Sequence, residues 1–576
     1  MTRVRQWLEG EFDSETKSEI QRMISYDPKE LEDAFYRNLE FGTGGLRGVI
    51  GAGPNRVNRY TIGMATQGLS NYILKSFPKR KDLSVAISFD CRNFSREFAE
   101  ISADVFSSNG IRVYLYKELR PTPQLSFTVR HLGCVAGVMI TASHNPKEYN
   151  GYKVYWEDGA QIISPHDTNI INEVTKVANP SNVRFKRDDS KISMLGDDID
   201  NQYLDAIITL SLSPDAIKKF RDFGIVYTPL HGTGVKMVPE ILKRAGFQNV
   251  ITVKEQEEIN GNFPTVKSPN PEEPSALKMA LDLAEKKSAQ LVLATDPDAD
   301  RIGVATRDQD GKMILLNGNQ TATLLTYYLL QRFSDKGRII RGQKNERFYM
   351  VKTIVTTDLL SAIAGSFGVR MYNVLTGFKY IASVVEENQG KREFIGGGEE
   401  SFGFNAGEYV RDKDAVLSAL LISETAVWAA SKGKSLYELL IDIYIEFGLF
   451  KERLVSVTKK GIDGLMQIKD IMNRLRENPL LSIDGTQTLL VHDYLKSETI
   501  DLVSDLRYKI NLPSSDVLQY VSSDNSMVSV RPSGTEPKIK YYLAVRSELN
   551  SIDEYHSLDH LLEQKLDRLQ KEVTDL

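Results

Sequence analysis

Three aspartates stand at alternate positions in TDPDADR, residues 295–301, directly after the apolar run AQLVLA. That run predicts a buried strand that ends where the aspartates begin. In extended backbone Asp296, Asp298 and Asp300 point the same way, and three such close carboxylates repel one another unless a cation lies between them. Hard oxygen ligands favour Mg²⁺, Mn²⁺ or Ca²⁺ over zinc; a solvated acidic turn is the alternative interpretation. The stretch lacks the glycine and glutamate that an EF-hand requires.

A second stretch, TASHNPKEYNGYK at residues 141–153, places Ser143 beside His144 after the apolar run CVAGVMI. This order predicts an exposed turn just past the end of a buried strand. A hydrolase nucleophile with His144 as its base is disfavoured, because adjacent side chains rarely meet and the G-x-S-x-G pattern is absent. If a metal coordinates an oxygen on Ser143, it can stabilise a phosphoryl group there. Lys153 is then a proton-transfer group if neighbouring cations lower its pKa. Each residue alone is also compatible with a structural role.

The loop RPSGTEPKIK, residues 531–540, is suited to binding an anion. Arg531 offers paired donors, and Ser533, Thr535 and the backbone amides around Gly534 can surround a dianion. An ordinary glycine turn is the alternative.

Two more regions offer weaker signals for a sugar. GGGEESFGF supplies Glu399 and Ser401, whose polar groups suit sugar hydroxyls. TGFK at residues 376–379 and RDKD at residues 411–414 add possible donors. Each is also compatible with a charged loop.

The sequence around these loops predicts strands and helices in alternation. DLSVAISFDCRN predicts a strand, EFAEISADVFSSNG a helix and IRVYLY a second strand, which together form a βαβ unit with a parallel sheet. The same order recurs in FGIVYTPLHGTG with VKMVPEILKRAGF, and again in YMVKTIVTTDLLSAIAGSFG. Open α/β sheets place their sites at the carboxyl ends of parallel strands, where these polar loops stand. The glycine-rich FGTGGLRGVIGAGPNR is predicted to be a loop, and the forty residues before it helical.

The length of 576 residues exceeds one ordinary core and predicts several domains. We expect an α/β fold of three consecutive α/β domains with mixed sheets and a smaller C-terminal α+β domain. The expected ranges are 1–212, 213–325 and 326–453 for the α/β domains, and 454–576 for the α+β domain.

Composition excludes several classes of function. The net charge is −5 and no long basic run occurs, which disfavours nucleic-acid binding and membrane adhesion. The two cysteines, Cys91 and Cys134, are too few for a disulfide framework and suit a reducing cytosol. The charged N-terminus does not resemble a signal peptide, so we expect a cytoplasmic protein.

Four motifs, TASHNP, DPDADR, GGEES and RPSGTEP, occur together in an order and spacing that resemble the α-D-phosphohexomutase family, and more closely its phosphoglucomutase type. The long N-terminal lead-in and FGTGGLRG resemble the phosphoglucomutase 2-like branch, which also contains phosphopentomutases and a glucose-1,6-bisphosphate synthase. The resemblance covers essentially the whole chain. It implies a heart-shaped enzyme of four domains around a central cleft.

The resemblance also implies roles for individual residues. Ser143 would be a phosphoserine whose phosphate completes a Mg²⁺ site with Asp296, Asp298 and Asp300. The other implied catalytic residues are His144, Lys153, Arg47 and Arg301. The implied substrate-binding residues are His231, Thr376, Gly377, Lys379, Glu399, Ser401, Lys413, Arg531, Ser533, Gly534 and Thr535. DKDA departs from many relatives, which carry glycine after the second aspartate, and this bears on Lys413.

The activity that this resemblance implies is interconversion of glucose 1-phosphate and glucose 6-phosphate. Phosphate passes from the serine to the sugar and back, with glucose 1,6-bisphosphate as intermediate and activator. A phosphomannomutase or phosphopentomutase of the same family is an alternative, since the sequence does not select the sugar. A metal-dependent phosphatase and a non-catalytic phosphosugar-binding protein are more remote alternatives. The expected partner is a small phosphosugar, with the protein a monomer or weak homodimer.

Overall fold

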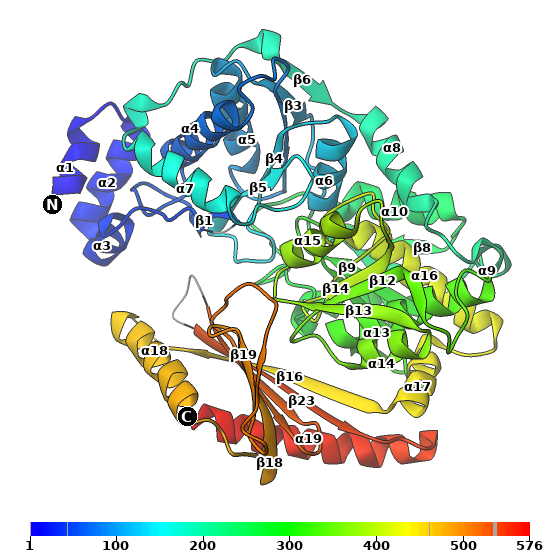
Figure 1. Ribbon diagram of the computed structural model, residues 1–576. Helices are drawn as coiled ribbons and strands as arrows, with labels where there is room; N and C mark the ends of the chain where they lie inside the picture. The colour runs from blue at the N-terminus through cyan, green and yellow to red at the C-terminus, as the bar shows by residue number, and fades with distance from the viewer. Residues whose placement is uncertain (1, 43, 460, 534–537, 576) are drawn as a thin grey trace.

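The computed structural model describes residues 2–42, 44–459, 461–533 and 538–575 (Figure 1). It contains three consecutive α/β domains with mixed sheets, followed by a β-rich domain, as the sequence predicts. In Figure 1 the first domain (blue to cyan) lies at the top, the second and third pack together on the right, and the last (yellow to red) lies below.

The first sheet has the strand order β1-β5-β4-β2-β3-β6. Strands β2, β3, β4 and β6 run parallel, and β5 and β1 extend the sheet antiparallel. The predicted N-terminal helices are present and form a small core of their own around Trp7, which stacks on Phe12. The elements are α1 (Thr2–Glu9), α2 (Ser14–Tyr26), α3 (Pro28–Phe35), β1 (Gly45–Val49), α4 (Arg59–Ser76), β2 (Ser84–Phe89), α5 (Ser95–Ser108), β3 (Arg112–Tyr116), α6 (Thr122–His131), β4 (Ala136–Ile140), β5 (Tyr149–Trp156), α7 (His166–Val177), β6 (Ile192–Leu195) and α8 (Asp197–Ile208), with short 3₁₀ turns at Pro180–Asn182 and Asp189–Lys191.

Strand β1 lies inside the glycine-rich stretch that the sequence predicts to be a loop. Gly45 has φ of +130°, and a Cβ built on it would lie 1.8 Å from the carbonyl oxygen of Tyr152 on β5. Only glycine permits this close approach, so here the glycines serve strand pairing. The consequence for the site is that Arg47 is held in register opposite Gly151 of β5.

The second sheet has the order β11-β10-β9-β7-β8, with β9, β7 and β8 parallel and the β9–β10–β11 meander antiparallel. Strand β9 is fully buried, as the run AQLVLA predicts. The elements are α9 (Pro214–Lys219), β7 (Ile225–Thr228), α10 (Gly234–Ala245), β8 (Val250–Thr252), α11 (Lys254–Glu257), α12 (Pro274–Lys287), β9 (Leu291–Thr295), β10 (Ile302–Arg307) and β11 (Met313–Leu316).

The third sheet has the order β13-β12-β14-β15, parallel except for β15. A capping box between Asn317 and Gln320 begins its first helix. The elements are α13 (Gly318–Asp335), β12 (Asn345–Thr353), α14 (Leu359–Ser366), β13 (Val369–Val374), α15 (Phe378–Asn388), β14 (Glu393–Glu399), β15 (Gly403–Ala406), α16 (Ala415–Ser431) and α17 (Leu436–Phe447).

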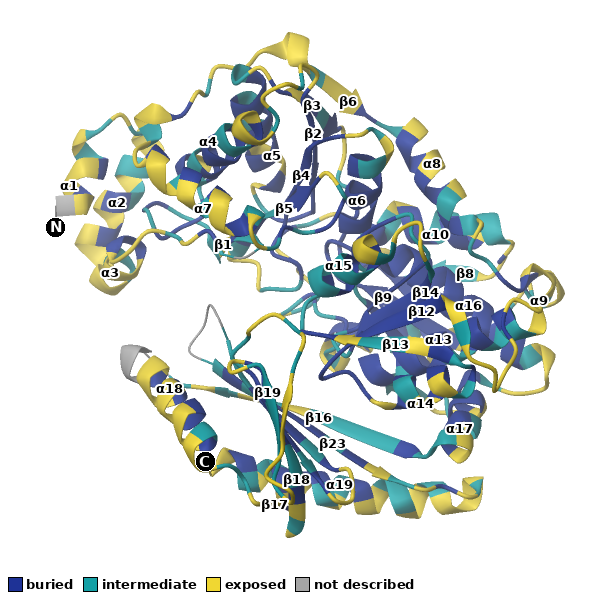
Figure 2. Ribbon diagram, viewed as in Figure 1, coloured by how far each residue is buried: buried dark blue, intermediate teal, exposed yellow. Residues whose placement is uncertain are grey.

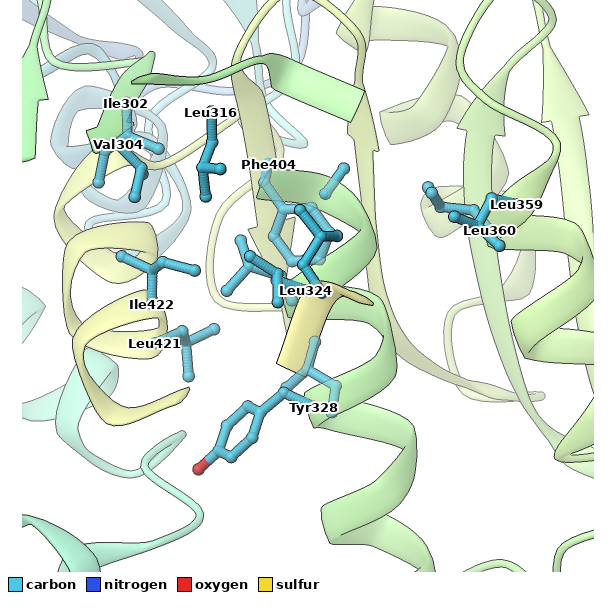
Figure 3. Close-up of a cluster of buried hydrophobic side chains, with 14 of the residues drawn as sticks. Ile302, Val304, Leu316, Leu324, Tyr328, Leu359, Leu360, Phe404, Leu421 and Ile422 are labelled. Atoms are coloured by element: carbon cyan, nitrogen blue, oxygen red, sulfur yellow. The ribbon is translucent and has the colours of Figure 1, made fainter. Parts of the chain in front are cut away.

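The second and third domains share one hydrophobic core. Figure 3 shows Ile302 and Val304 of β10 beside Leu421 and Ile422 of α16, with Leu324 of α13 nearby. Burial of this apolar surface fixes the loop after β9 relative to the third sheet. Among the described residues, none of the helices is by itself long and apolar enough to cross a membrane. The apolar pair α16 and α17, bent by 83° at their junction, lies mostly buried within this core.

The last domain is built on an antiparallel sheet with the order β16-β23-β22-β21-β18-β19-β20, and β17 pairs with β18 alone. Outer helices such as α18 and α19 are exposed on one side, whereas the strands of the α/β sheets are mostly buried (Figure 2). The elements are β16 (Leu449–Thr458), α18 (Gly461–Glu477), β17 (Ser482–Ile483), β18 (Thr486–Asp493), β19 (Glu498–Asp501), β20 (Arg507–Lys509), β21 (Leu518–Ser522), β22 (Met527–Pro532), β23 (Lys538–Ser547) and α19 (Ile552–Thr574).

Candidate active site

A cavity of about 890 Å³ lies where the four domains meet. The first domain contributes Arg47 and His144, and the second contributes Arg301. Loops of the third domain and strands of the last domain form the remaining walls. The predicted site residues that line this cavity are Arg47, His144, Arg301, Thr376, Gly377, Glu399, Ser401, Lys413, Arg531 and Ser533.

The three aspartates after β9 converge as predicted, but a turn and not extended backbone brings them together. Residues 297–299 form a turn in which Ala299 has φ of +49°, so the chain is not extended here. The turn brings one carboxylate oxygen of each aspartate within 4.8 Å of the others, and all three side chains are buried. Contacts from other elements hold the turn: the Thr122 hydroxyl at the start of α6 donates to Asp298 Oδ2 at 2.8 Å, and the Thr233 amide donates to the Pro297 carbonyl.

The charges of the three aspartates are unequal. Burial and repulsion from Asp298 and Asp300 raise the pKa of Asp296 well above its usual value. Burial also opposes ionisation of Asp298 and Asp300, but the ammonium groups of Lys153 and Lys413 outweigh it and hold both pKa values low. Lys413 Nζ lies 2.8 Å from Asp300 Oδ2.

This cluster fits a hard metal ion. Asp298 Oδ1 and Asp300 Oδ1 are buried without a hydrogen-bond partner, although buried polar atoms normally have one. Two unpaired carboxylate oxygens beside a third carboxylate make an all-oxygen donor set, which suits Mg²⁺ better than zinc. The acidic triad could therefore hold a metal ion, by its composition and by the closeness of its carboxylate oxygens.

Ser143 lies beside this triad. It follows β4 in a tight turn with φ of +53°, and its amide donates to the Thr141 hydroxyl at 2.8 Å. Ser143 Oγ donates to Asp296 Oδ2 at 2.7 Å and lies 3.3 Å from His144 Nδ1. Burial and nearby arginines lower the pKa of His144 well below its usual value, so its ring is neutral. The serine oxygen thus lies at the edge of the acidic triad.

Lys153 is in the predicted place but in an environment opposite to the predicted one. Its Nζ lies 2.7 Å from Asp298 Oδ2 and 3.4 Å from Asp300 Oδ2. Burial works against the charge of the ammonium group, but the two carboxylates outweigh it and raise the pKa of Lys153. The condition that neighbouring cations lower this pKa is therefore not met, because carboxylates lie against the ammonium group, and Lys153 carries its proton.

Arg92 is a residue that the sequence analysis missed. Its guanidinium is fully buried under the serine loop and donates to four backbone carbonyls, including Ser143 at 2.6 Å and Pro146 at 2.8 Å. The other two carbonyls belong to Asn145 and Tyr149. The only available signal was the polar end of the strand in SFDCRN, because nothing in the sequence pairs that end with residues 143–149. Arg92 therefore acts as a positioning residue for Ser143.

We expect Arg92→Met to lower kcat by about a hundredfold with a smaller change in KM. Four carbonyls lose their donors, and misplacement of a reacting group by about 1 Å costs on this scale. Lysine cannot replace the planar fork, so Arg92→Lys should be impaired as well. Arg96→Met, which changes an exposed arginine on the adjacent helix α5, is the matched control.

Hydrogen exchange separates this positioning role from general destabilisation. Amides of residues 141–149 should exchange faster in Arg92→Met, while the other strands of the first sheet keep their protection. Unchanged kcat in a folded variant would contradict the positioning role.

Loops of the third domain bring the predicted sugar-binding groups into the cavity. Glu399, at the end of β14, accepts from the Gly377 amide at 2.9 Å. Burial raises the pKa of Glu399 to about 7, although Lys413 attracts its charged form. Thr376 Oγ1 is buried without a partner. A carboxylate and an unpaired hydroxyl on one wall suit the hydroxyl groups of a sugar.

The last domain contributes a further part of the cavity wall. Arg531 and Ser533 lie at the end of β22, and the Ser533 amide donates to the Lys538 carbonyl at 2.7 Å. Gly534 and Thr535, predicted to bind the same phosphate, lie outside the described residues.

Two predicted substrate-binding residues lie elsewhere. His231 is fully buried, and both ring nitrogens are used, at 2.7 Å from the Glu258 carbonyl and 2.8 Å from Thr265 Oγ1. Lys379 lines a separate cavity of about 280 Å³ beside Trp156 and His166. It is the second residue of helix α15. Burial and repulsion from Arg531 of the main cavity lower the pKa of Lys379, although Asp167 attracts its charged form, so Lys379 also lies near the main cavity. Thr376 and Gly377 precede the helix and line the main cavity.

Family models describe the α/β/α domains I, II and III of phosphoglucomutase/phosphomannomutase, and they match residues 38–181, 201–311 and 317–447 of this chain. These matches cover more than half of the chain and end before the last domain. The chain belongs to the phosphoglucomutase/phosphomannomutase family.

Curated relatives agree with this family. The phosphoglucomutase of Staphylococcus aureus strain MSSA476 is 37% identical over 544 residues, which cover 94% of this chain and 95% of that protein. The phosphoglucomutase of Staphylococcus haemolyticus strain JCSC1435 is 36% identical over 89% of this chain and 91% of that protein.

Solved structures agree on the fold. The open form of the Paramecium phosphoprotein parafusin, a phosphoglucomutase, superposes with a TM-score of 0.65 over 92% of this chain and 95% of that chain. Its sequence identity is 18%, so the likeness shows a shared fold.

Proposed function

We propose that the protein is a phosphoglucomutase that interconverts glucose 1-phosphate and glucose 6-phosphate through a phosphate carried on Ser143. The observation that carries this proposal is the contact of Ser143 Oγ with Asp296 Oδ2 at 2.7 Å, at the edge of an acidic triad and beside a cavity large enough for a phosphosugar. The family and its phosphoglucomutase relatives support it.

The transfer exchanges one P–O bond for another. The bond between phosphorus and Ser143 Oγ breaks as a bond forms to the free hydroxyl of the sugar monophosphate. Lys153 gives its proton to Ser143 Oγ, and the proton of the sugar hydroxyl restores the ammonium group of Lys153. The product is glucose 1,6-bisphosphate. The bisphosphate reorients within the cavity, and its other phosphate is then transferred to Ser143. Phosphoryl transfer depends mainly on positioning and on charge stabilisation, and the cavity offers groups for both.

The chain's own residues supply these effects. Asp296, Asp298 and Asp300 would hold Mg²⁺, which supplies positive charge to the transferring phosphoryl group. Arg47 and Arg301 extend that positive charge along the cavity wall. Lys153 holds a proton that it can give to the oxygen that loses phosphate, and His144 is neutral beside Ser143.

Binding at two ends orients the sugar. Glu399, Ser401 and Thr376 face the hydroxyl groups, and Lys413 links this wall to Asp300. Arg531 and Ser533 hold the phosphate that is not being transferred. Because either end of the bisphosphate must occupy that subsite, the subsite binds a phosphate group on either carbon of the sugar.

A steady-state comparison of glucose 1-phosphate, mannose 1-phosphate and ribose 1-phosphate tests the proposal. Glucose 1-phosphate should give the highest kcat/KM and should yield glucose 6-phosphate. A preference for mannose 1-phosphate or ribose 1-phosphate would replace glucose as the substrate. Release of inorganic phosphate without glucose 6-phosphate would identify a phosphatase instead.

The titration of the Glu399 carboxyl should be visible in the dependence of kcat/KM on pH. Because its pKa is raised to about 7, Glu399 takes up a proton as pH falls through that value and offers sugar hydroxyls one acceptor fewer. We expect kcat/KM to rise with pH through about 7. Glu399→Gln should lower the plateau about ten- to a hundredfold, the range for a hydrogen bond to a charged group.

The comparison of the two profiles identifies the group. Glu399→Gln should lose the limb near 7 and keep the limb of the substrate phosphate, whose second pKa is about 6. Profiles of the same shape for both proteins would mean that Glu399 does not control this limb.

A further inference from the structure

We propose that Tyr155 of the first domain is a positioning residue for the reaction, because it holds Lys413 of the third domain in place through the carboxylate of Asp412. This inference rests on the proposed function and adds to it a fully buried residue outside the lining of the cavity. It is carried by the hydrogen bonds that join residues 411–414 to hydroxyl groups of the first domain.

Three buried hydroxyl groups of the first domain, on α6, β5 and α8, hold the segment of residues 411–414. The three bonds run from the Arg411 amide to Ser126 Oγ at 2.9 Å, from the Tyr155 hydroxyl to Asp412 Oδ2 at 2.7 Å, and from the Tyr203 hydroxyl to Asp414 Oδ2 at 2.7 Å. All six residues are buried, so water does not compete for these bonds. We call the three first-domain side chains the hydroxyl clamp. The clamp fixes the chain on both sides of Lys413.

Lys413 is the residue of this segment that reaches the site. Its Nζ lies 2.8 Å from Asp300 Oδ2 and 3.2 Å from Asp412 Oδ1. The stem of Lys413 passes close over Gly403, where a Cβ would lie 2.4 Å from Lys413 Cδ. The side chain therefore has little room to move, and the orientation of Asp412 decides where its ammonium group lies.

Tyr155 controls that orientation. Asp412 Oδ1 accepts from both the amide and the ammonium group of Lys413, whereas Oδ2 accepts from Tyr155. Within the described residues, no side chain besides Tyr155 and Lys413 hydrogen-bonds to this carboxylate. Loss of the tyrosine hydroxyl would leave a buried carboxylate oxygen without a donor, and a rotation that satisfies it would move the acceptor of both lysine bonds.

The position of Lys413 affects both halves of the site. Its ammonium group contacts Asp300 of the acidic triad, and it attracts the charged form of Glu399, which faces the sugar. A shift of Lys413 would therefore change the alignment of the sugar with the phosphate on Ser143.

Strand β5 explains how the first domain coordinates these two halves. Lys153 and Tyr155 are two positions apart on this strand, so their side chains lie on the same face of the sheet. Lys153 contacts the triad directly at Asp298, and Tyr155 reaches the third domain at Asp412. One strand thus fixes both the phosphoryl-transfer groups and the wall that faces the sugar.

The test compares Tyr155→Phe, which removes only the hydroxyl, with Tyr116→Phe. Tyr116 is buried in the same domain outside the cavity lining, and its hydroxyl lies 2.6 Å from Thr128 Oγ1. Each protein is phosphorylated with glucose 1,6-bisphosphate, and transfer to glucose 6-phosphate and loss of phosphate to water are measured. Tyr155→Phe should slow the transfer about tenfold, since a misplacement of about 1 Å costs about a hundredfold. Loss to water needs no aligned sugar and should keep the parental rate. Tyr116→Phe should match the parent in both rates.

A double-mutant cycle shows whether Tyr155 acts through Asp412. Asp412→Asn should slow the transfer about tenfold or more by itself. Adding Tyr155→Phe to it should slow the transfer no further, because the effects of two residues that act through one bond are not additive. Losses that multiply in the double variant would overturn the assignment.

Hydrogen exchange tests the clamp without turnover. The Lys413 amide, which donates to Asp412 Oδ1 at 2.9 Å, should exchange about tenfold faster in Tyr155→Phe and at the parental rate in Tyr116→Phe. Parental transfer in folded Tyr155→Phe, or an equal loss in the transfer and in the reaction with water, would overturn the positioning role. A parent without mutase turnover would refute the proposed function, and exchange of the Lys413 amide would then decide by itself whether Tyr155 holds this segment.

Discussion

Replacing Ser143 with alanine is expected to abolish mutase turnover, by more than about a thousandfold, while leaving the protein folded. The proposed cycle carries every phosphate through Ser143 Oγ, and alanine has no atom to receive it. The structure offers no other hydroxyl in contact with Asp296 among the described residues. The loss should therefore be in kcat with any phosphosugar, independent of substrate concentration.

The fold should tolerate this change. The Ser143 amide keeps its bond to Thr141 Oγ1, and Asp296 Oδ1 still accepts from the amides of Asp300 and Arg301. The serine hydroxyl is one hydrogen bond, worth about 1 kcal/mol, so the midpoint of thermal unfolding should change little.

Mass spectrometry provides the direct readout. The parent, incubated with glucose 1,6-bisphosphate, should gain one phosphate, about 80 Da, on the peptide that contains Ser143. Ser143→Ala should gain none, and Ser181→Ala, at an exposed serine of the same domain, should behave as the parent does. Turnover at the parental rate in Ser143→Ala would refute the phosphoserine cycle.

Removal of the metal is expected to have the second largest effect. A chelator should silence the enzyme, and added Mg²⁺ should restore it. Asp298→Asn removes one negative charge from the triad, at the residue whose Oδ1 has no hydrogen-bond partner. We expect the variant to lose several kcal/mol of transition-state stabilisation. At about 1.4 kcal/mol for each factor of ten, we expect a loss of at least about a hundredfold in kcat.

A measurement without turnover isolates metal binding. Mg²⁺ should raise the thermal stability of the parent, because a ligand at a hundred times its Kd stabilises the folded state by about 2.7 kcal/mol. Asp298→Asn should lose this response. Asp310→Asn, at an exposed aspartate in the β10–β11 turn, should retain both the response and the activity. Full activity in excess chelator would refute the metal site.

The sequence alone determined the fold class and the residues with the strongest local signals. A buried apolar run followed by polar residues predicts a strand and a loop at its carboxyl end, and both the Ser143 loop and the aspartates after β9 occupy such positions. Three carboxylates two residues apart repel one another strongly when the backbone brings them together, and on this ground the sequence predicts a cation between them. The convergence of the carboxylates is confirmed, although a turn and not extended backbone produces it.

Only the tertiary structure decided how residues from different domains meet. Arg92 is about fifty positions from the serine loop that it holds, and nothing local distinguishes it from a surface arginine. His231 stands in a polar loop but is turned away from the cavity, because the Glu258 carbonyl and Thr265 engage both nitrogens of its ring. β1 forms from a stretch that reads as a loop, since the glycines that disfavour a strand locally allow close pairing with β5. The protonation of Lys153 was likewise decided by carboxylates roughly 150 residues away, because charge interactions follow distance in space and not distance along the chain.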